Sequence, residues 1–224
     1  MSGLEEQDIC FICLNPGANS RDHIVPLCLF TQPLPPDLLT LPAHSDCHNQ
    51  TEEEYFRNIV SLRALKSNVI AGELWKTKAL RSLIRNPSLQ NRTLKSLHRK
   101  SDRYSNGGIY VGTGSAIKFE VKRFYPTLEK LVRGLYRHYF SRFLGIKTTF
   151  QWGIDEPLVG EKRQDFEDCV PGLKYPEVFD SKYGCYSNET TEWTLWFFCF
   201  YDSLLIRCLT ISDLSQEEAR SVAD

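Results

Sequence analysis

The sequence predicts an α+β protein built from three consecutive parts, and three observations support this class. Cys and His residues are paired near the N-terminus, a strongly basic run with helical periodicity follows, and the second half alternates turn signals with β-branched and aromatic runs. We expect a metal-built module over residues 1–58, a basic helical bridge over 59–104, and an α+β domain with antiparallel strands over 105–224. At 224 residues and 42% hydrophobic content, the chain can bury a substantial core.

The first part contains two pairs of candidate metal ligands, Cys10 with Cys13 and His44 with Cys47. Two residues separate the members of each pair, a spacing that lets one tight turn aim both side chains at a tetrahedral ion. Four protein ligands leave no position for a reactive water, so we predict a closed structural Zn²⁺ site. Ordinary thiols and a redox CxxC pair are the alternatives, and the second ligand pair favours zinc over both.

Asp22, His23 and His48 lie in the same segment and are not needed for that zinc site. A carboxylate is a hard oxygen ligand that suits Mg²⁺ or Mn²⁺, and an imidazole can complete such a site. A second imidazole can deprotonate water near neutral pH. Together these residues supply the parts needed to hydrolyse a phosphodiester bond.

Three short motifs together resemble the HNH endonucleases, and the resemblance covers about residues 8–58. They are CFIC at 10–13, DHIVP at 22–26 and HSDCHN at 44–49. The resemblance implies a ββα-metal finger, also called a treble clef, whose two outer ligand pairs bind structural zinc.

The resemblance also implies a role for each remaining polar residue of the motifs. His23 would be the general base, and Asp22 and His48 would hold a catalytic Mg²⁺ or Mn²⁺. Typical members carry an asparagine before the second ligand pair that helps to orient the catalytic histidine, but residues 37–41 of this chain are DLLTL. Asn49 follows His48 directly and does not replace that asparagine, so we expect it to be a secondary ligand of the catalytic site or a helix cap.

The net charge of −1 conceals a strong asymmetry along the chain. Residues 1–56 carry a net charge of −8, residues 57–147 carry +16, and residues 148–224 carry −9. Lys and Arg neutralise phosphates and release counterions, so the basic middle predicts contact with DNA, and RNA is not excluded. The alternative is that these cations lie on solvent-exposed faces of helices and bind no partner. We expect the DNA contacts to come from four residues: Lys76, Lys78, Arg81 and Arg85.

The first two parts should contain a short hairpin and three helices. We expect Asp22 and His23 on the hairpin, which is followed by a proline-rich loop over residues 31–42. The expected helices run from Ser45 or Asp46 through Val69 to about Gly72, over residues 73–85, and over residues 88–100, the last two separated by Asn86 and Pro87.

The third part should combine one long helix with several strands. We expect a hairpin of strands 109–112 and 116–121 around Gly114, and a helix from Pro126 to Gly145. The cations of this helix are expected on an exposed basic face: Lys130, Arg133, Arg137 and Arg142. Four further strands, over 148–152, 177–186, 193–201 and 204–211, should pack on the helix.

The leading interpretation is a metal-dependent endonuclease that hydrolyses phosphodiester bonds in DNA. The alternative is a zinc-stabilised nucleic-acid-binding protein without catalysis, and a zinc-built protein-interaction domain explains fewer of the residues. Residues 1–9 do not resemble a signal peptide, and no apolar run approaches about eighteen residues, so we expect a cytoplasmic protein with no membrane partner. The sequence does not fix the oligomeric state and is compatible with a dimer.

Overall fold

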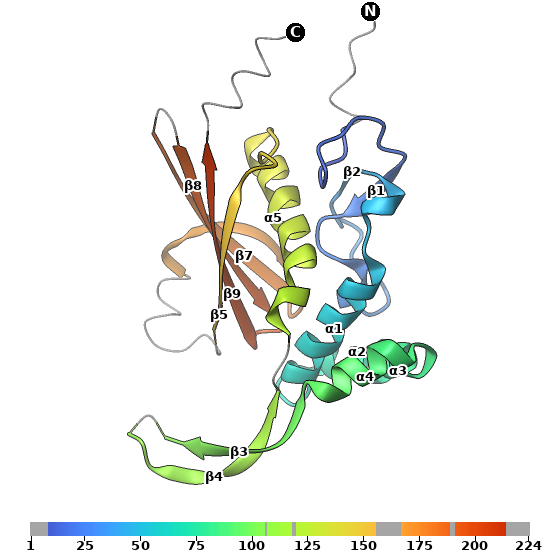
Figure 1. Ribbon diagram of the computed structural model, residues 1–224, viewed down its shortest axis with the longest axis vertical. Helices are drawn as coiled ribbons and strands as arrows, with labels where there is room; N and C mark the ends of the chain where they lie inside the picture. Colours follow the sequence, from blue (N-terminus) through green and yellow to red (C-terminus); the bar gives the residue numbers. More distant parts are fainter. Residues whose placement is uncertain (1–8, 106, 118–119, 156–166, 189–190, 214–224) are drawn as a thin grey trace, which may run out of the picture.

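The structure of the protein is a computed structural model, which describes residues 9–105, 107–117, 120–155, 167–188 and 191–213. It is an α+β fold with three antiparallel sheets, which confirms the predicted class at that level (Figure 1). The polar N-terminal residues 1–8 and most of the C-terminal tail lie outside the described residues. No helix in the described ranges is long and apolar enough to cross a membrane.

The N-terminal hairpin consists of β1 (Ser20–His23) and β2 (Thr40–Ala43), paired antiparallel with His23 opposite Thr40. The prediction that Asp22 and His23 lie on a hairpin is therefore confirmed. Its long connection contains only a short 3₁₀ helix, η2 (Leu27–Leu29), before the prolines, which cannot donate to a helical or strand ladder.

The first long helix, α1 (Gln50–Ala64), begins later than predicted. A 3₁₀ helix, η3 (Ser45–Cys47), comes first, and His48 then adopts an extended backbone. Asn49 is the N-cap of α1, because its side chain accepts a hydrogen bond from the amide of Glu52 at 3.2 Å. The expectation that Ser45 or Asp46 starts the helix is wrong because the 3₁₀ turn that presents the second ligand pair occupies those positions.

A nearly continuous helical segment follows α1 after a break. It comprises α2 (Val69–Leu74), the π-helical η4 (Trp75–Ala79) and α3 (Leu80–Arg85). The first helix thus does not reach Gly72 as predicted, since Asn68 caps a new helix through the Ala71 amide and Val69 is 85% exposed.

The predicted stop at Asn86 and Pro87 is confirmed. Asn86 follows α3 and caps α4 (Pro87–Lys95) by accepting from the Leu89 amide. This last helix is shorter than expected, because the chain enters a strand at Leu97 instead of remaining helical to Lys100.

The strands β3 (Leu97–Tyr104) and β4 (Tyr110–Ile117) form a hairpin that extends away from the body of the protein (Figure 1). The prediction of two strands on either side of Gly114 is wrong. The turn lies earlier, where the Ser105 amide donates to the Ile109 carbonyl and Gly108 adopts a positive φ of 77°.

The long helix α5 (Tyr125–Phe140) follows the 3₁₀ helix η5 (Val121–Arg123). It ends before Gly145 because Ser141 takes the left-handed conformation, with φ of 56°. One face of α5 packs on the large sheet, where the rings of Tyr139 and Tyr183 stack at a centroid distance of 4.8 Å.

The large sheet is antiparallel with the order β5-β9-β8-β7-β6. Its strands are β5 (Thr149–Asp155), β6 (Val170–Tyr175), β7 (Phe179–Ser187), β8 (Thr191–Phe200) and β9 (Leu204–Asp213). Four of these strands confirm the prediction, with ends shifted by a few residues. The fifth, β6, was not predicted because it contains Pro171 and Gly172, which are tolerated at the edge position that it occupies.

The helix α5 lies between the large sheet and the N-terminal hairpin (Figure 1). Residues from the hairpin connection, α1, α5 and the sheet share one hydrophobic core that includes Ile24, Phe56, Leu131 and Phe200. The approach is closest at Gly134 of α5, where an added Cβ would lie 2.9 Å from a methyl carbon of Ile24. This close packing brings side chains of α5 to the back of the N-terminal module.

Candidate functional site

The first ligand pair lies on a tight turn that is fixed to the hairpin. The Cys10 amide donates to the Asn15 carbonyl at 3.0 Å, and the Leu14 amide donates to the Cys10 carbonyl at 2.9 Å. The Phe11 amide donates to the Pro42 carbonyl of β2, also at 3.0 Å. The turn therefore faces the end of β2, directly before the second ligand pair.

The four predicted zinc ligands come together at this place. One ligand atom each from Cys10, Cys13, His44 and Cys47 lies within 4.8 Å of the others. The Nδ1 atom of His44 is 3.3 Å from the Cys13 sulfur, while Nε2 is 3.2 Å from the Pro16 carbonyl oxygen. A hydrogen on Nε2 would donate to that carbonyl and leave the Nδ1 lone pair for a metal, as is usual for histidine ligands.

The electrostatics of this cluster also fit a bound cation. Burial raises the pKa of the Cys10 thiol, but backbone amides of Cys13, His44 and Ile12 outweigh it and lower the pKa below its ordinary value. Burial and the neighbouring sulfurs of Cys13 and Cys10 raise the pKa of Cys47 to about 12. A cation among the three sulfurs offsets the cost of charging them together, so the Cys₃His set can bind a metal such as zinc.

A second group of possible ligands consists of Asp22, His48 and Glu53. The Nδ1 atom of His48 lies 3.2 Å from Asp22 Oδ2 and 3.6 Å from Glu53 Oε1. Sequence reasoning proposed Asp22 and His48 but missed Glu53, which belongs to an acidic run that suits the start of a helix. Only its burial, at 5% exposure, distinguishes Glu53.

Lys130 of α5 completes this group from the far side of the module. Its Nζ atom lies 2.6 Å from Asp22 Oδ2 and 2.5 Å from Glu53 Oε1, and the residue is 5% exposed. The expectation of an exposed basic face is wrong for Lys130 and also for Arg133, which is buried against the carbonyl of Leu144. The reason is that α5 is covered on both sides, by the sheet and by the N-terminal module.

Lys130 also determines the charge state of Asp22. Burial alone would raise the pKa of the Asp22 carboxyl, but the ammonium of Lys130 and the ring of His48 lower it below the ordinary value. Asp22 is therefore a carboxylate at neutral pH, whether its partner is Lys130 or a metal ion.

His23 borders a pocket of about 180 Å³ that it shares with Asp22, His48 and Glu53. Burial lowers the pKa of His23, and the charge of Lys130 lowers it further, while Asp22 and Glu53 partly oppose the shift. A neutral imidazole at pH 7 is the form that can accept a proton from water.

The imidazole of His23 makes no hydrogen bond with the part of the chain that the structure describes. Thr40 lies opposite His23 in the hairpin, and its hydroxyl accepts from Arg21 Nε at 2.9 Å. The strand neighbour of His23 therefore does not orient its imidazole. Of the two roles expected for Asn49, the structure shows the helix cap, since its side chain accepts from the Glu52 amide at the start of α1.

A basic pocket of about 280 Å³ shares one lining residue, Glu54, with the His23 pocket. Lys78, Arg81 and Arg85, three of the four cations expected to contact DNA, line the basic pocket, whereas Lys76 does not. Arg57, which the sequence did not single out, also lines the pocket.

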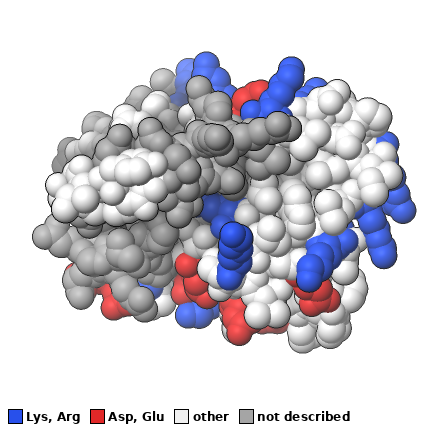
Figure 2. Space-filling model, turned by 90° about the horizontal axis from the view of Figure 1, so that it is seen from below, with Lys and Arg blue, Asp and Glu red and all other residues white. Residues whose placement is uncertain are grey.

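Not every cation of this surface is equally available to a ligand. The Lys78 ammonium already donates to the Phe30 carbonyl at 2.5 Å, whereas Arg81 and Arg85 are exposed. Seen from below, Lys and Arg side chains are spread singly over the described part of the surface, with Asp and Glu between them (Figure 2).

Comparison with known proteins does not assign the chain to a family. No protein-family model matches it, and no curated protein and no solved structure is significantly similar to it. The functional argument therefore rests on the arrangement of the residues themselves.

Proposed function

We propose that this protein is a metal-dependent HNH endonuclease that hydrolyses phosphodiester bonds in DNA. The observation that carries the proposal is the meeting of Asp22, His23 and His48 around one pocket, next to the Cys₃His cluster. A base, a carboxylate and an imidazole ligand beside a fixed metal cluster are the parts that metal-assisted hydrolysis requires.

The order of the elements supports the finer proposal of a ββα-metal, or treble-clef, finger. A turn with the first ligand pair, the hairpin β1–β2, a turn with the second pair, and α1 follow one another. In this proposal Zn²⁺ on Cys10, Cys13, His44 and Cys47 is structural, because all four positions are filled by protein.

The proposed reaction begins at His23. Its neutral imidazole takes a proton from water, the resulting hydroxide attacks the phosphorus of the backbone, and the bond from phosphorus to the leaving ester oxygen breaks. Asp22, His48 and Glu53 would hold a Mg²⁺ or Mn²⁺ ion, which supplies positive charge for the phosphate and for the leaving oxygen when bound. Two oxygens and one imidazole nitrogen suit such an ion, although Lys130 contacts the same two oxygens in this structure.

DNA is the proposed substrate because a basic pocket lies on the other side of Glu54 from the proposed reaction site, where it could bind neighbouring phosphates. A strand with one phosphate near His23 would have neighbouring phosphates near Arg81 and Arg85. Contacts of this kind act on phosphates and carry no sequence preference. An RNA strand offers the same reacting group, so both polymers belong in the first assay.

A second candidate function is a zinc-stabilised nucleic-acid-binding protein without catalysis. Two observations favour it: Thr40 stands opposite His23 where no asparagine orients the ring, and Lys130 already neutralises Asp22 and Glu53. Such a protein would bind the phosphate backbone through the same basic pocket.

Incubation of supercoiled plasmid with the purified protein decides between these functions. The endonuclease should nick or linearise the plasmid with Mg²⁺ or Mn²⁺ and should stop when EDTA removes the ion. Retardation of the plasmid without any cleavage, at every metal concentration, would exclude the nuclease and leave the binding function.

A further inference from the structure

Lys130 occupies the place where a cation is expected between the buried carboxylate of Glu53 and the partly buried carboxylate of Asp22. Its ammonium contacts Oδ2 of Asp22 and Oε1 of Glu53, the two oxygens that lie closest to His48 Nδ1. We infer that Lys130 is the resident cation of this carboxylate pair and that a divalent ion binds there only by displacing it. This inference rests on the proposed function for the choice of ion.

The distances make joint occupancy unfavourable. A Mg²⁺ ion needs its oxygen ligands at about 2.0–2.1 Å and accepts little distortion of its octahedron. The Lys130 nitrogen already lies 2.6 Å and 2.5 Å from the same two oxygens. An ion and an ammonium that share both oxygens are held close together, and their repulsion in a buried site opposes binding of both.

The opposite condition, with neither cation present, is also unfavourable. Glu53, which is buried, and Asp22, which is partly buried, would then face each other with only His48 beside them, which is costly for two carboxylates. The site therefore favours one cation between the two carboxylates and disfavours two. The ammonium keeps the module folded before a divalent ion arrives.

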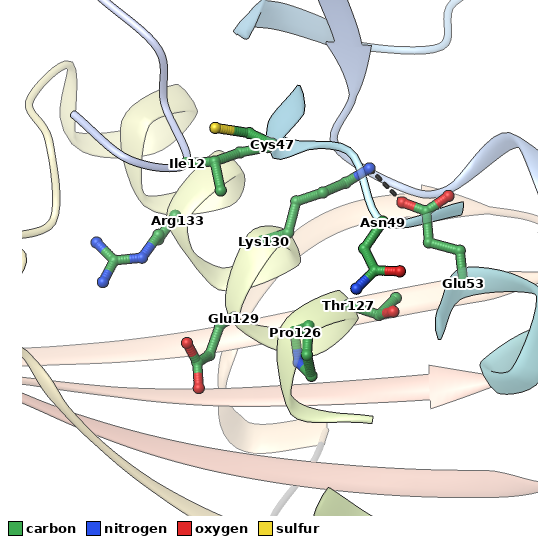
Figure 3. Close-up of a pocket in the computed structure, with 9 residues that line it drawn as sticks. All are labelled: Ile12, Cys47, Asn49, Glu53, Pro126, Thr127, Glu129, Lys130 and Arg133. Atoms are coloured by element: carbon green, nitrogen blue, oxygen red, sulfur yellow. Dashed lines mark hydrogen bonds and ion pairs between the residues drawn. The ribbon is translucent and has the colours of Figure 1, made fainter. Parts of the chain in front are cut away.

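A second position for the displaced ammonium is present next to the first. A pocket of about 290 Å³ is lined by Lys130 and Glu53 together with Asn49, Thr127 and Glu129 (Figure 3). Figure 3 shows Lys130 reaching from α5 past Asn49 to Glu53, while Thr127 borders the pocket from the preceding turn of the same helix. A change of side-chain rotamer would turn the ammonium into this pocket.

Thr127 gives this second position a hydrogen-bond acceptor that is not otherwise used. The residue is 4% exposed, and its hydroxyl oxygen has no hydrogen-bond partner among the described residues. Buried hydroxyls are normally paired, and in the displaced state this one can accept a hydrogen bond from the ammonium of Lys130. Glu129 also lines the pocket.

Binding of Mn²⁺ to the zinc-loaded, full-length protein tests the inference without any DNA. Electron paramagnetic resonance measures free Mn²⁺ during titration of the native protein, of Lys130→Met and of the control Lys122→Met, which removes a lysine near the start of α5 that lies outside the carboxylate pair. We expect Lys130→Met to bind one Mn²⁺ at least about tenfold more tightly than the native protein, because the competing charge is gone. Lys122→Met should bind like the native protein, and equal or weaker binding by Lys130→Met would overturn the inference.

A measurement on the native protein covers the case in which Lys130→Met does not fold. The side-chain ammonium signal of Lys130 is assigned by NMR from its absence in Lys130→Arg, which keeps the positive charge. Addition of Mg²⁺ should shift this signal, and Thr127→Val should weaken the Mg²⁺ affinity by removing the second acceptor. A Lys130 signal that stays unchanged up to the highest soluble Mg²⁺ concentration contradicts displacement.

Failure of the inference and failure of the nuclease proposal give different results. A protein that cleaves plasmid while Lys130→Met binds Mn²⁺ no more tightly than the native protein would keep the nuclease and reject displacement. Tighter Mn²⁺ binding by Lys130→Met in a protein that never cleaves would support displacement and reject the nuclease.

Discussion

Asp22 and Lys130 are 108 positions apart in the sequence, yet Oδ2 of the first and Nζ of the second lie 2.6 Å from each other. This contact joins the N-terminal module to the helix that supports the large sheet. Because both residues are largely buried, it couples the proposed reaction site to the common core. Changes at Lys130 should thus affect both the stability of the fold and the chemistry of the site.

Removal of Lys130 should destabilise the protein when no divalent ion is present. Lys130→Ala leaves Asp22 and Glu53 as unpaired buried charges, and loss of one partner of a buried ion pair typically costs about 3–5 kcal/mol. Urea denaturation of the zinc-loaded protein in buffer without added Mg²⁺ or Mn²⁺ should show this loss, while Lys122→Ala should unfold like the native protein. Equal unfolding midpoints for the two variants would mean that the ammonium is not needed for stability.

Acid should weaken the same contact in a defined pH range. The folded pKa of Asp22 lies below its ordinary value of 3.8, so the stabilisation is fully present above that pH and is lost as pH falls through the lower, folded pKa. Asp22→Asn should remove this part of the acid sensitivity, as seen in the free energy of unfolding measured between about pH 2 and 5. If the free energy of unfolding falls with pH to the same extent in Asp22→Asn and in the native protein, other carboxyls account for the acid sensitivity.

The Cys₃His cluster should contain zinc that the N-terminal module needs for folding. Cys13→Ser or Cys47→Ser should lose the metal and unfold the module, because a structural zinc contributes roughly 10–16 kcal/mol of apparent binding free energy. Elemental analysis and circular dichroism measure the two effects, and Cys185→Ser, an exposed cysteine outside the cluster, is the control. Protein purified without chelator that contains no zinc would refute this site.

The basic pocket should supply much of the DNA affinity. Arg81→Gln combined with Arg85→Gln should weaken binding for all sequences alike, and the slope of log K against log salt should become shallower by about 0.9 for each phosphate that is no longer neutralised. Lys76→Gln is a matched control, since Lys76 is exposed on the same helical segment but does not line the pocket. If the double variant keeps the native slope, the strand follows another path to His23.

The sequence allows prediction of the parts of the site that depend on local spacing. The two ligand pairs, the hairpin with Asp22 and His23, and the stop at Asn86 all follow from short-range rules about turns, caps and metal ligands. The treble-clef and nuclease interpretations go further, and they remain proposals that the experiments above address.

The sequence does not allow prediction of the parts that depend on distant packing. Lys130 occurs on α5 with other cations, as on any solvated helix, and only the close approach of α5 at Gly134 brings it to Asp22. In the sequence Glu53 does not differ from its acidic neighbours Glu52 and Glu54, and only the structure shows that it is buried. The predicted start of α1 is wrong for a related reason. Residues Ser45–Cys47 form the 3₁₀ turn that positions the second ligand pair, so the helix begins later, with Asn49 as its N-cap.

The most direct test of the central claim is the rate of plasmid cleavage by His23→Ala compared with the native protein, both zinc-loaded and assayed at saturating Mg²⁺ or Mn²⁺. His23 borders the pocket but does not belong to the zinc cluster, so the variant should keep its zinc content and its unfolding midpoint. The account predicts a fall in cleavage rate of about 10²–10⁴-fold, the usual effect of losing a general base. Cleavage at the native rate by the folded variant would contradict it.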